Sequence, residues 1–196
     1  SHPTLQENGA LPVAPSAIKP AGETFTGQGM EAFVTPRALS VEDIAEIVAR
    51  FRQGALNAIE AGFDGVELHG ANGYLIDQFL RDGTNQRSDR YGGSLENRTR
   101  FLVEVTEAVA GAIGADRVGV RFSPTSGFND MRDADPQRTF EHAAAALSQF
   151  GLAYLLALTV LGGYVALVRD TIQIVRVFGD VLRVVLVASL AIEILS

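Results

Sequence analysis

The chain has 196 residues, of which 47% are hydrophobic and 20% charged, which fits one folded domain and excludes a disordered or fibrous chain. It contains no cysteine, so disulfides, thiolate metal sites and cysteine nucleophiles are excluded, and a reducing, cytoplasmic location is expected. The formal net charge of −7 has the wrong sign for a general polyanion-binding protein, so we expect no nucleic acid partner.

The first predicted elements are a long loop and a helix. Residues 1–38 contain five of the seven prolines and no sustained periodicity, which predicts a long ordered loop with room for a short hairpin. The opening residues show neither a basic region nor an apolar run, so no signal peptide is expected. Ser40 is a strong helix N-cap, apolar residues follow it at helical spacing, and Gly62 ends the predicted helix.

Strands and helices then alternate in the sequence. Three short strands are predicted, each separated from the next by helical sequence: 65–69, 118–122 and 152–155. The helices between them are predicted over 74–80, 94–113 and 136–149, the last capped by Asp135. This alternation predicts an α/β fold with a parallel sheet, either an open doubly wound sheet or a TIM (β/α)8-type barrel. No Gly-x-Gly-x-x-Gly follows a strand, which argues against a dinucleotide-binding open sheet.

The composition changes near Gly151. Of the last 46 residues 31 are hydrophobic, against 61 of the first 150. Residues 152–168 carry no charge and just reach the length of a membrane-spanning helix, but Thr159 and Gly162-Gly163 interrupt the run, so a buried strand and helix are favoured. We therefore predict a helix from about Tyr164 to Phe178, an end at Gly179 and a strand over Arg183–Ala188.

Chemistry-bearing residues follow two of the predicted strands. In a barrel, active-site groups lie where strands end, which singles out His69, and Arg121 with Ser123. His69 and Asn72 can donate hydrogen bonds from one turn toward a shared oxygen, and Tyr74 carries a phenolic proton. Arg121 is a permanent cation suited to an electron-rich ring or an oxyanion. A histidine that only satisfies the core and a tyrosine that only packs are the structural alternatives.

Several longer stretches of the sequence occur together in one order. They are Ser1-His2-Pro3, residues 9–16, 66–75, 78–80 and 85–94, Asn97-Arg98, Arg100-Phe101, and Val120-Arg121-Phe122-Ser123-Pro124. In these stretches, which span about residues 1–155, the chain resembles the old yellow enzyme family of FMN-dependent ene-reductases, which are (β/α)8 barrels. So many matches in one order are far more specific than a single His-x-x-Asn.

The resemblance implies a role for each candidate residue. His69 and Asn72 would bind the carbonyl oxygen of an α,β-unsaturated carbonyl substrate, and Tyr74 would protonate its α-carbon. FMN, reduced by NADH or NADPH, would give a hydride to the β-carbon, and Arg121 would lie against the flavin. The protein then supplies orientation, electrophilic assistance and a proton. No metal site is expected. The charged segment Arg87–Arg100 is interpreted as a network of ion pairs and turns that closes the barrel rim, rather than as a binding loop.

The same resemblance implies an incomplete barrel. A full barrel has eight βα units, whereas the likeness starts after the third strand and ends near Leu155. We expect a partial flavin-oxidoreductase barrel over 1–155, with a loop at 1–38 and βα units at 39–155, and an atypical apolar tail over 156–196 with further βα structure. Exposed sheet edges in such a chain favour a homo-oligomer or another partner. Two alternatives stay open: a truncated or chimeric fragment that acts as an interaction or structural module, and a membrane-associated protein that uses the tail.

Overall fold

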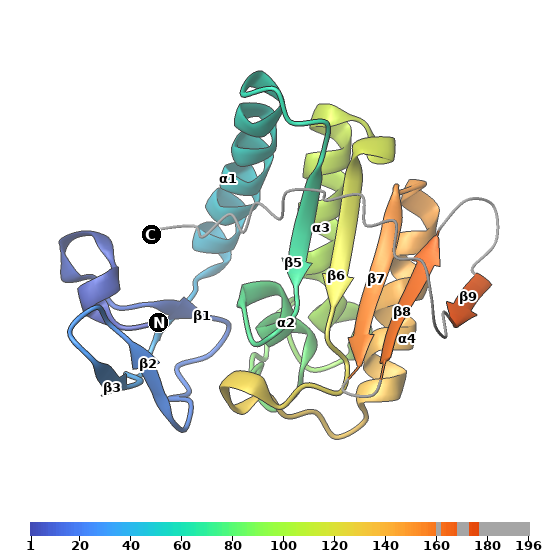
Figure 1. Cartoon of the computed structure of the whole chain (residues 1–196). Coiled ribbons are helices and arrows are strands. Elements are labelled where there is room, and N and C mark those ends of the chain that lie inside the picture. Colours follow the sequence, from blue (N-terminus) through green and yellow to red (C-terminus); the bar gives the residue numbers. More distant parts are fainter. Residues whose placement is uncertain (160–161, 168–172, 177–196) are drawn as a thin grey trace.

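An open five-stranded sheet forms the centre of the structure, a computed structural model that describes residues 1–159, 162–167 and 173–176 (Figure 1). The strands follow one another in space as in sequence, and their bounds are β5 (Val66–Gly70), β6 (Val118–Phe122), β7 (Tyr154–Thr159), β8 (Gly162–Leu167) and β9 (Gln173–Arg176). The first three run parallel, whereas β8 and β9 are each antiparallel to the strand before them. Among the described residues, β5 and β9 are therefore the two edges of the sheet.

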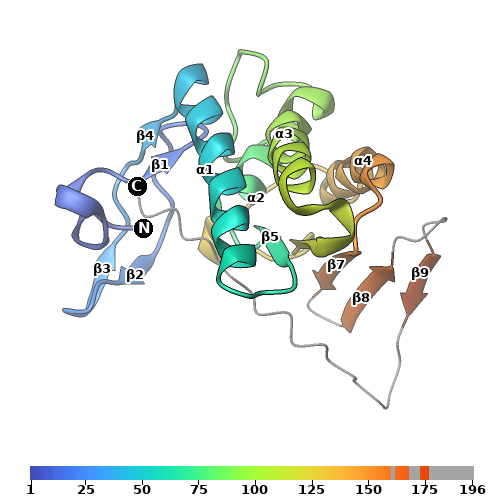
Figure 2. The same ribbon diagram turned by 90° about the horizontal axis from the view of Figure 1, so that it is seen from above.

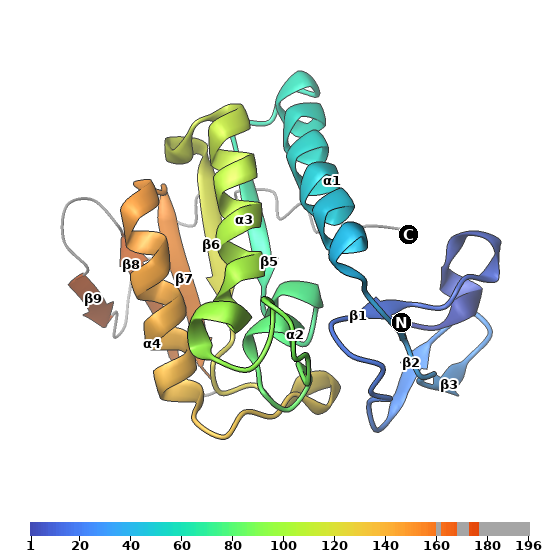
Figure 3. The ribbon, with the colours of Figure 1, turned by 180° about the vertical axis from the view of Figure 1, so that it is seen from behind.

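Helices cover one face of this sheet. Their bounds are α1 (Val41–Glu60), α2 (Leu75–Leu80), α3 (Leu95–Ile113) and α4 (Pro136–Leu147). Figures 2 and 3 show α1, α3 and α4 side by side on the same face, while α2 lies at the carboxyl end of β5. Ser40 begins α1 with a capping box, in which its side chain accepts from the Asp43 N–H and Asp43 accepts from the Ser40 N–H. The side chain of Asp135 caps α4, as predicted.

Alternation along the strands decides which residues face the helices. Val66 and Leu68 of β5 and Val120 of β6 are buried in the core formed with the helices. The intervening residues point to the face that the described helices leave uncovered, and the register aligns Glu67 with Gly119 and Tyr154, and His69 with Arg121. Polar side chains thus gather on one face, near the carboxyl ends of two parallel strands.

The N-terminal segment lies beside the β5 edge (Figure 1). It contains two short pairs of strands, β1 (Val13–Ala14) with β4 (Arg37–Ala38) in parallel, and β2 (Glu23–Phe25) with β3 (Met30–Ala32) as a hairpin. Distant side chains hold the segment: Asp130 accepts from the Ala21 N–H at 3.1 Å, and Arg87 donates to the Pro15 carbonyl at 2.9 Å. The segment contains the short hairpin for which the sequence left room, together with a parallel strand pair that was not predicted.

The tail differs from its prediction. A helix was expected from Tyr164 to Phe178, but residues 162–167 and 173–176 form strands, so that prediction is wrong over these residues. Valine, isoleucine and tyrosine are abundant there and pack well in strands. Only two residues separate β7 from β8, too few for the crossover helix that a parallel connection requires. The predicted strand Arg183–Ala188 lies outside the described residues.

The barrel prediction holds only in part. The parallel βα arrangement from β5 to β7 agrees with it, but the described residues form no closed barrel, because β8 turns back antiparallel and β5 remains an edge. No helix in the described part of the chain has both the length and the apolar character needed to cross a bilayer.

Gly119 of β6 leaves no room for a side chain. A Cβ at Gly119 would lie 2.1 Å from the Cζ atom of Tyr154, whose ring covers this residue. We expect Gly119→Ala to destabilise the fold by roughly 1–3 kcal/mol, measured from denaturant unfolding midpoints. Adding Tyr154→Ala should make the alanine at 119 nearly neutral. Equal losses with and without Tyr154 would contradict this origin of the effect.

Candidate functional site

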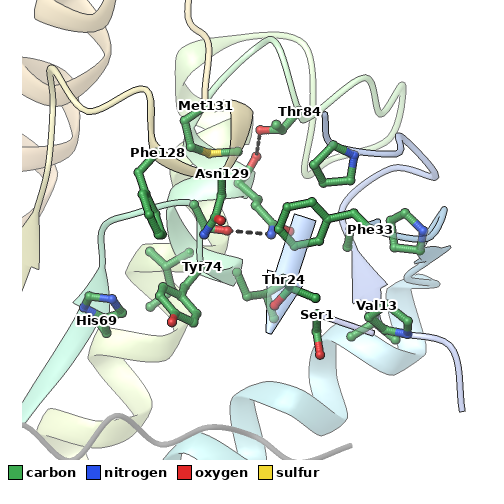
Figure 4. Close-up of a pocket in the computed structure, with 18 of the residues that line it drawn as sticks. Ser1, Val13, Thr24, Phe33, His69, Tyr74, Thr84, Phe128, Asn129 and Met131 are labelled. Carbon is green, nitrogen blue, oxygen red and sulfur yellow. Dashed lines mark hydrogen bonds between the residues drawn. The ribbon is translucent and has the colours of Figure 1, made fainter. Parts of the chain in front are cut away.

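His69 and Tyr74 lie in contact at the carboxyl end of β5. His69 belongs to β5, and Tyr74 is the N-cap residue of α2, five positions later. Their ring centroids are 4.8 Å apart with the planes at 58° (Figure 4). His69 is half-buried, while 47% of Tyr74 is exposed, so the phenol is accessible from solvent. The short turn between the strand and the helix thus brings an imidazole and a phenol together.

Both rings line a cavity of about 760 Å³ beside the free edge of β5. Its wall combines the N-terminal segment, α1, α2 and the loop after β6 (Figure 4). Large apolar side chains that are exposed on the protein, Phe25, Met30 and Phe128, also line it. A mostly apolar cavity with a few polar groups is typical of sites for small organic molecules. Asn72 and Arg121 are not among the lining residues.

Asn72 is held through its main chain. It adopts a left-handed conformation with φ 56°, and Gly73 follows with φ 76°. The Asn72 N–H donates to Ser123 Oγ at 2.8 Å, and the Asn72 carbonyl accepts from Asn129 Nδ2 at 2.9 Å. The turn that carries the predicted carboxamide is therefore attached on both sides to the loop after β6.

Arg121 pairs with His69 in the sheet register and has an unused donor. Its Nε atom is buried, and no hydrogen-bond partner for it lies in the described part of the chain. A buried donor of this kind costs free energy unless a ligand or water accepts from it. The guanidinium therefore offers a charged donor on the uncovered face of the sheet, next to the imidazole.

The surroundings of His69 favour its neutral form. Burial lowers the pKa of His69 from its ordinary value of 6.5, the charge of Arg121 lowers it further, and the charge of Glu67 partly opposes both. At neutral pH the imidazole is therefore uncharged, with one ring N–H to donate and one nitrogen to accept. That state suits hydrogen bonding to a carbonyl oxygen.

A buried ion pair next to the turn after β5 was not predicted from the sequence. Asp77 and Arg81, four residues apart on α2 and at its end, are buried and joined by an Nε to Oδ1 bond of 2.8 Å. The other Asp77 oxygen accepts from the Gly73 N–H at 2.9 Å, and Arg81 Nη2 donates to the Ser123 carbonyl at 2.8 Å. The i,i+4 spacing of opposite charges is the signal that would have found it.

The segment Arg87–Arg100 has the structural role favoured from the sequence. Arg87 pairs with Asp89 and donates to main-chain carbonyls of the N-terminal segment. Arg100 Nε donates to the Arg90 carbonyl at 2.8 Å. These charges hold loops together.

Comparisons with known proteins identify the family to which the chain belongs. Residues 4–160 match the model of the NADH:flavin oxidoreductase / NADH oxidase family. The 12-oxophytodienoate reductase 7 of Oryza sativa subsp. japonica is 51% identical over 164 residues, which cover 79% of this chain and 41% of that protein. A Leishmania infantum protein named "Probable flavin mononucleotide-dependent alkene reductase" is 48% identical over 158 residues, covering 78% of this chain and 43% of the relative.

A solved structure gives the same result. The old yellow enzyme homologue from Zymomonas mobilis has a TM-score of 0.75 and 43% identity, covering 77% of this chain and 42% of that one. The chain thus spans less than half the length of the relatives it matches. Since the family model matches well over half of the chain, the chain belongs to the NADH:flavin oxidoreductase / NADH oxidase family, which the sequence resemblance had identified through the old yellow enzymes.

Proposed function

We propose that this chain carries the acceptor-binding residues of an FMN-dependent ene-reductase that reduces the C=C bond of an α,β-unsaturated carbonyl compound with NADH or NADPH. One observation carries the proposal: His69, which is neutral and in contact with Tyr74, lies opposite Arg121 in the strand register. The buried Nε of Arg121 has no hydrogen-bond partner among the described residues. Family membership supports the same reaction class. The chain spans under half the length of each of these relatives, so its activity is a proposal that the tests below address on the chain itself.

Arg121 is the residue that we propose for contact with the flavin. FMN, when bound, supplies the hydride for the β-carbon of the acceptor. The buried Nε atom of Arg121 fits this group, because a flavin ring presents carbonyl and ring-nitrogen acceptors to a donor with no partner among the described residues. Because a guanidinium stays protonated at neutral pH, its positive charge would stabilise negative charge on the reduced flavin ring.

His69 and Asn72 are proposed to bind the acceptor carbonyl. A neutral His69 donates one ring N–H, and the Asn72 carboxamide donates a second hydrogen bond. Two donors on one oxygen stabilise the negative charge that develops there when hydride adds to the β-carbon. The apolar wall of the cavity fits the hydrocarbon part of such a substrate.

Tyr74 is proposed to complete the reduction. Hydride addition leaves a carbanion-like α-carbon, and a proton from the Tyr74 hydroxyl forms the last C–H bond, after which solvent reprotonates the phenolate. The accessible position of the ring allows that return of the proton.

A second candidate is an interaction or structural module without flavin turnover. The open β5 edge and the coverage of less than half of each relative favour it. The two candidates differ in whether the chain retains FMN.

Flavin retention provides the first test. The purified chain, incubated with FMN and desalted, should keep the visible absorbance of bound flavin. Arg121→Met should weaken binding about tenfold or more, because hydrogen bonds to charged groups are worth roughly 1.5–3 kcal/mol. Arg117→Met removes the same charge from an exposed site just before β6 and should leave FMN affinity unchanged. A chain that retains no flavin favours the module.

Loss of the Tyr74 hydroxyl tests the proton donor. Tyr74→Phe should lower enone-dependent NAD(P)H oxidation by about 10²–10⁴, the usual size of a general-acid contribution. Oxidation with ferricyanide, which takes electrons without a proton on carbon, should stay at the wild-type rate. Full enone activity in this variant would refute the assignment.

The protonation of His69 can be followed by NMR of its ring protons. Its titration midpoint should lie below 6.5. Arg121→Met removes a charge that lowers this pKa and should raise the midpoint, whereas Glu67→Gln removes one that raises it and should lower the midpoint. The two substitutions therefore act with opposite signs. Shifts of the same sign, or none, would overturn the electrostatic account.

A further inference from the structure

The left-handed backbone at Asn72 requires support from its surroundings. A non-glycine residue with positive φ is strained, and such conformations persist where neighbouring groups determine them. Asparagine tolerates this region better than most residues, which makes it suitable but does not fix it there. The direction of the Asn72 carboxamide depends on this backbone conformation. The groups that hold the backbone therefore also fix the direction in which the carboxamide donates.

Two side chains of the loop after β6 hold the peptide groups on either side of Asn72. Ser123 Oγ accepts from the Asn72 N–H at 2.8 Å, and Asn129 Nδ2 donates to the Asn72 carbonyl at 2.9 Å. These partners lie 51 and 57 positions away in the chain. Together they fix the orientation of both peptide planes, and therefore φ and ψ at Asn72.

Ser123 is itself held in place. Its side chain is buried, and its carbonyl accepts from Arg81, which pairs with Asp77, which in turn accepts from the Gly73 N–H. The contacts close a ring that runs from the turn through α2 to the end of β6 and back to the turn. The Ser123 main chain is therefore held by Arg81 at the position from which its hydroxyl reaches the Asn72 N–H.

Asn129 is held from the opposite side. A Cβ on Gly73 would lie 2.8 Å from the Asn129 Cβ, so the two loops are in close contact. The next residue, Asp130, accepts from the Ala21 N–H at 3.1 Å and thereby joins the loop to the N-terminal segment. The Asn129 carboxamide is thus presented to Asn72 by a loop that contacts the turn at Gly73 and is joined to the N-terminal segment through Asp130.

We propose that Ser123 and Asn129 are positioning residues of the acceptor site: they hold Asn72 in its left-handed conformation so that its carboxamide acts with His69 on the acceptor carbonyl. The inference rests on the proposed function. Both residues act through the Asn72 main chain and leave the acceptor to Asn72 and His69.

The test uses Ser123→Ala, which removes the hydroxyl, and Asn129→Asp, which keeps the shape but cannot donate. In each holoenzyme variant, kcat/KM for 2-cyclohexenone should fall about tenfold, the effect of one lost hydrogen bond, while ferricyanide-supported NAD(P)H oxidation is unchanged. In an Asn72→Ala background neither substitution should have a further effect. Ser126→Ala removes another hydroxyl of the same loop, one that accepts from the Phe128 N–H, and should leave enone kinetics unchanged.

Amide hydrogen exchange of the flavin-free chain gives a readout independent of activity. Ser123→Ala should accelerate exchange at the Asn72 amide about tenfold, with the amides of β6 unchanged.

Three results would each overturn the proposal. The enone and ferricyanide rates of the variants could fall together, their enone kinetics could stay unchanged, or their loss could persist in the Asn72→Ala background. If wild-type protein with bound FMN reduces no enone, the proposed function fails and the positioning role fails with it. Fast Asn72 exchange in an active wild type would instead refute the main-chain support alone.

Discussion

The buried pair of Asp77 and Arg81 joins parts of the molecule that are far apart in sequence. One Asp77 oxygen accepts from the Gly73 N–H and the other from Arg81, which extends to the carbonyl of Ser123. Removing either partner would leave the other buried without its opposite charge, at a cost of about 3–5 kcal/mol. These hydrogen bonds therefore join the turn after β5 to the end of β6, and the candidate site lies on the two joined segments.

The strand register decides which side chains lie next to one another on the uncovered face of the sheet. In the parallel pairing of β5 with β6, His69 lies opposite Arg121, and Glu67 lies opposite Gly119, one layer further from the site. Tyr154 covers the glycine and donates to Glu67 at 2.9 Å, so this lower layer is filled and hydrogen-bonded. A shift by one residue would turn all of these side chains toward the helices. Arg121 lowers and Glu67 raises the pKa of His69 because the alternation of side chains in two short strands places all three on the same face.

Local patterns predicted local structure well. The N-caps Ser40 and Asp135 and the spacing from His69 to Tyr74 act over a few residues, and the structure agrees with the helices and the turn expected from them. The contacts of Asn72 could not be predicted in this way, because Ser123 and Asn129 reach it only through the fold. The tail failed for a different reason. A short apolar run such as 164–167 suits a buried helix or a buried strand equally well, and the antiparallel pairing with β7 decided between them.

The uncovered face of the sheet limits what can lie against it. Parallel sheets are usually covered on both faces, and here the described helices cover only one (Figure 2). The other face presents His69 and Arg121, and the buried Nε of Arg121 has no acceptor among the described residues, so a purely apolar cover would leave this donor unsatisfied. A planar group with an apolar surface and hydrogen-bond acceptors at its rim satisfies both demands, since it can stack on the sheet and accept from the guanidinium. An isoalloxazine ring has these properties, and for this reason the electrostatics of the face and the family of the chain lead to the same cofactor.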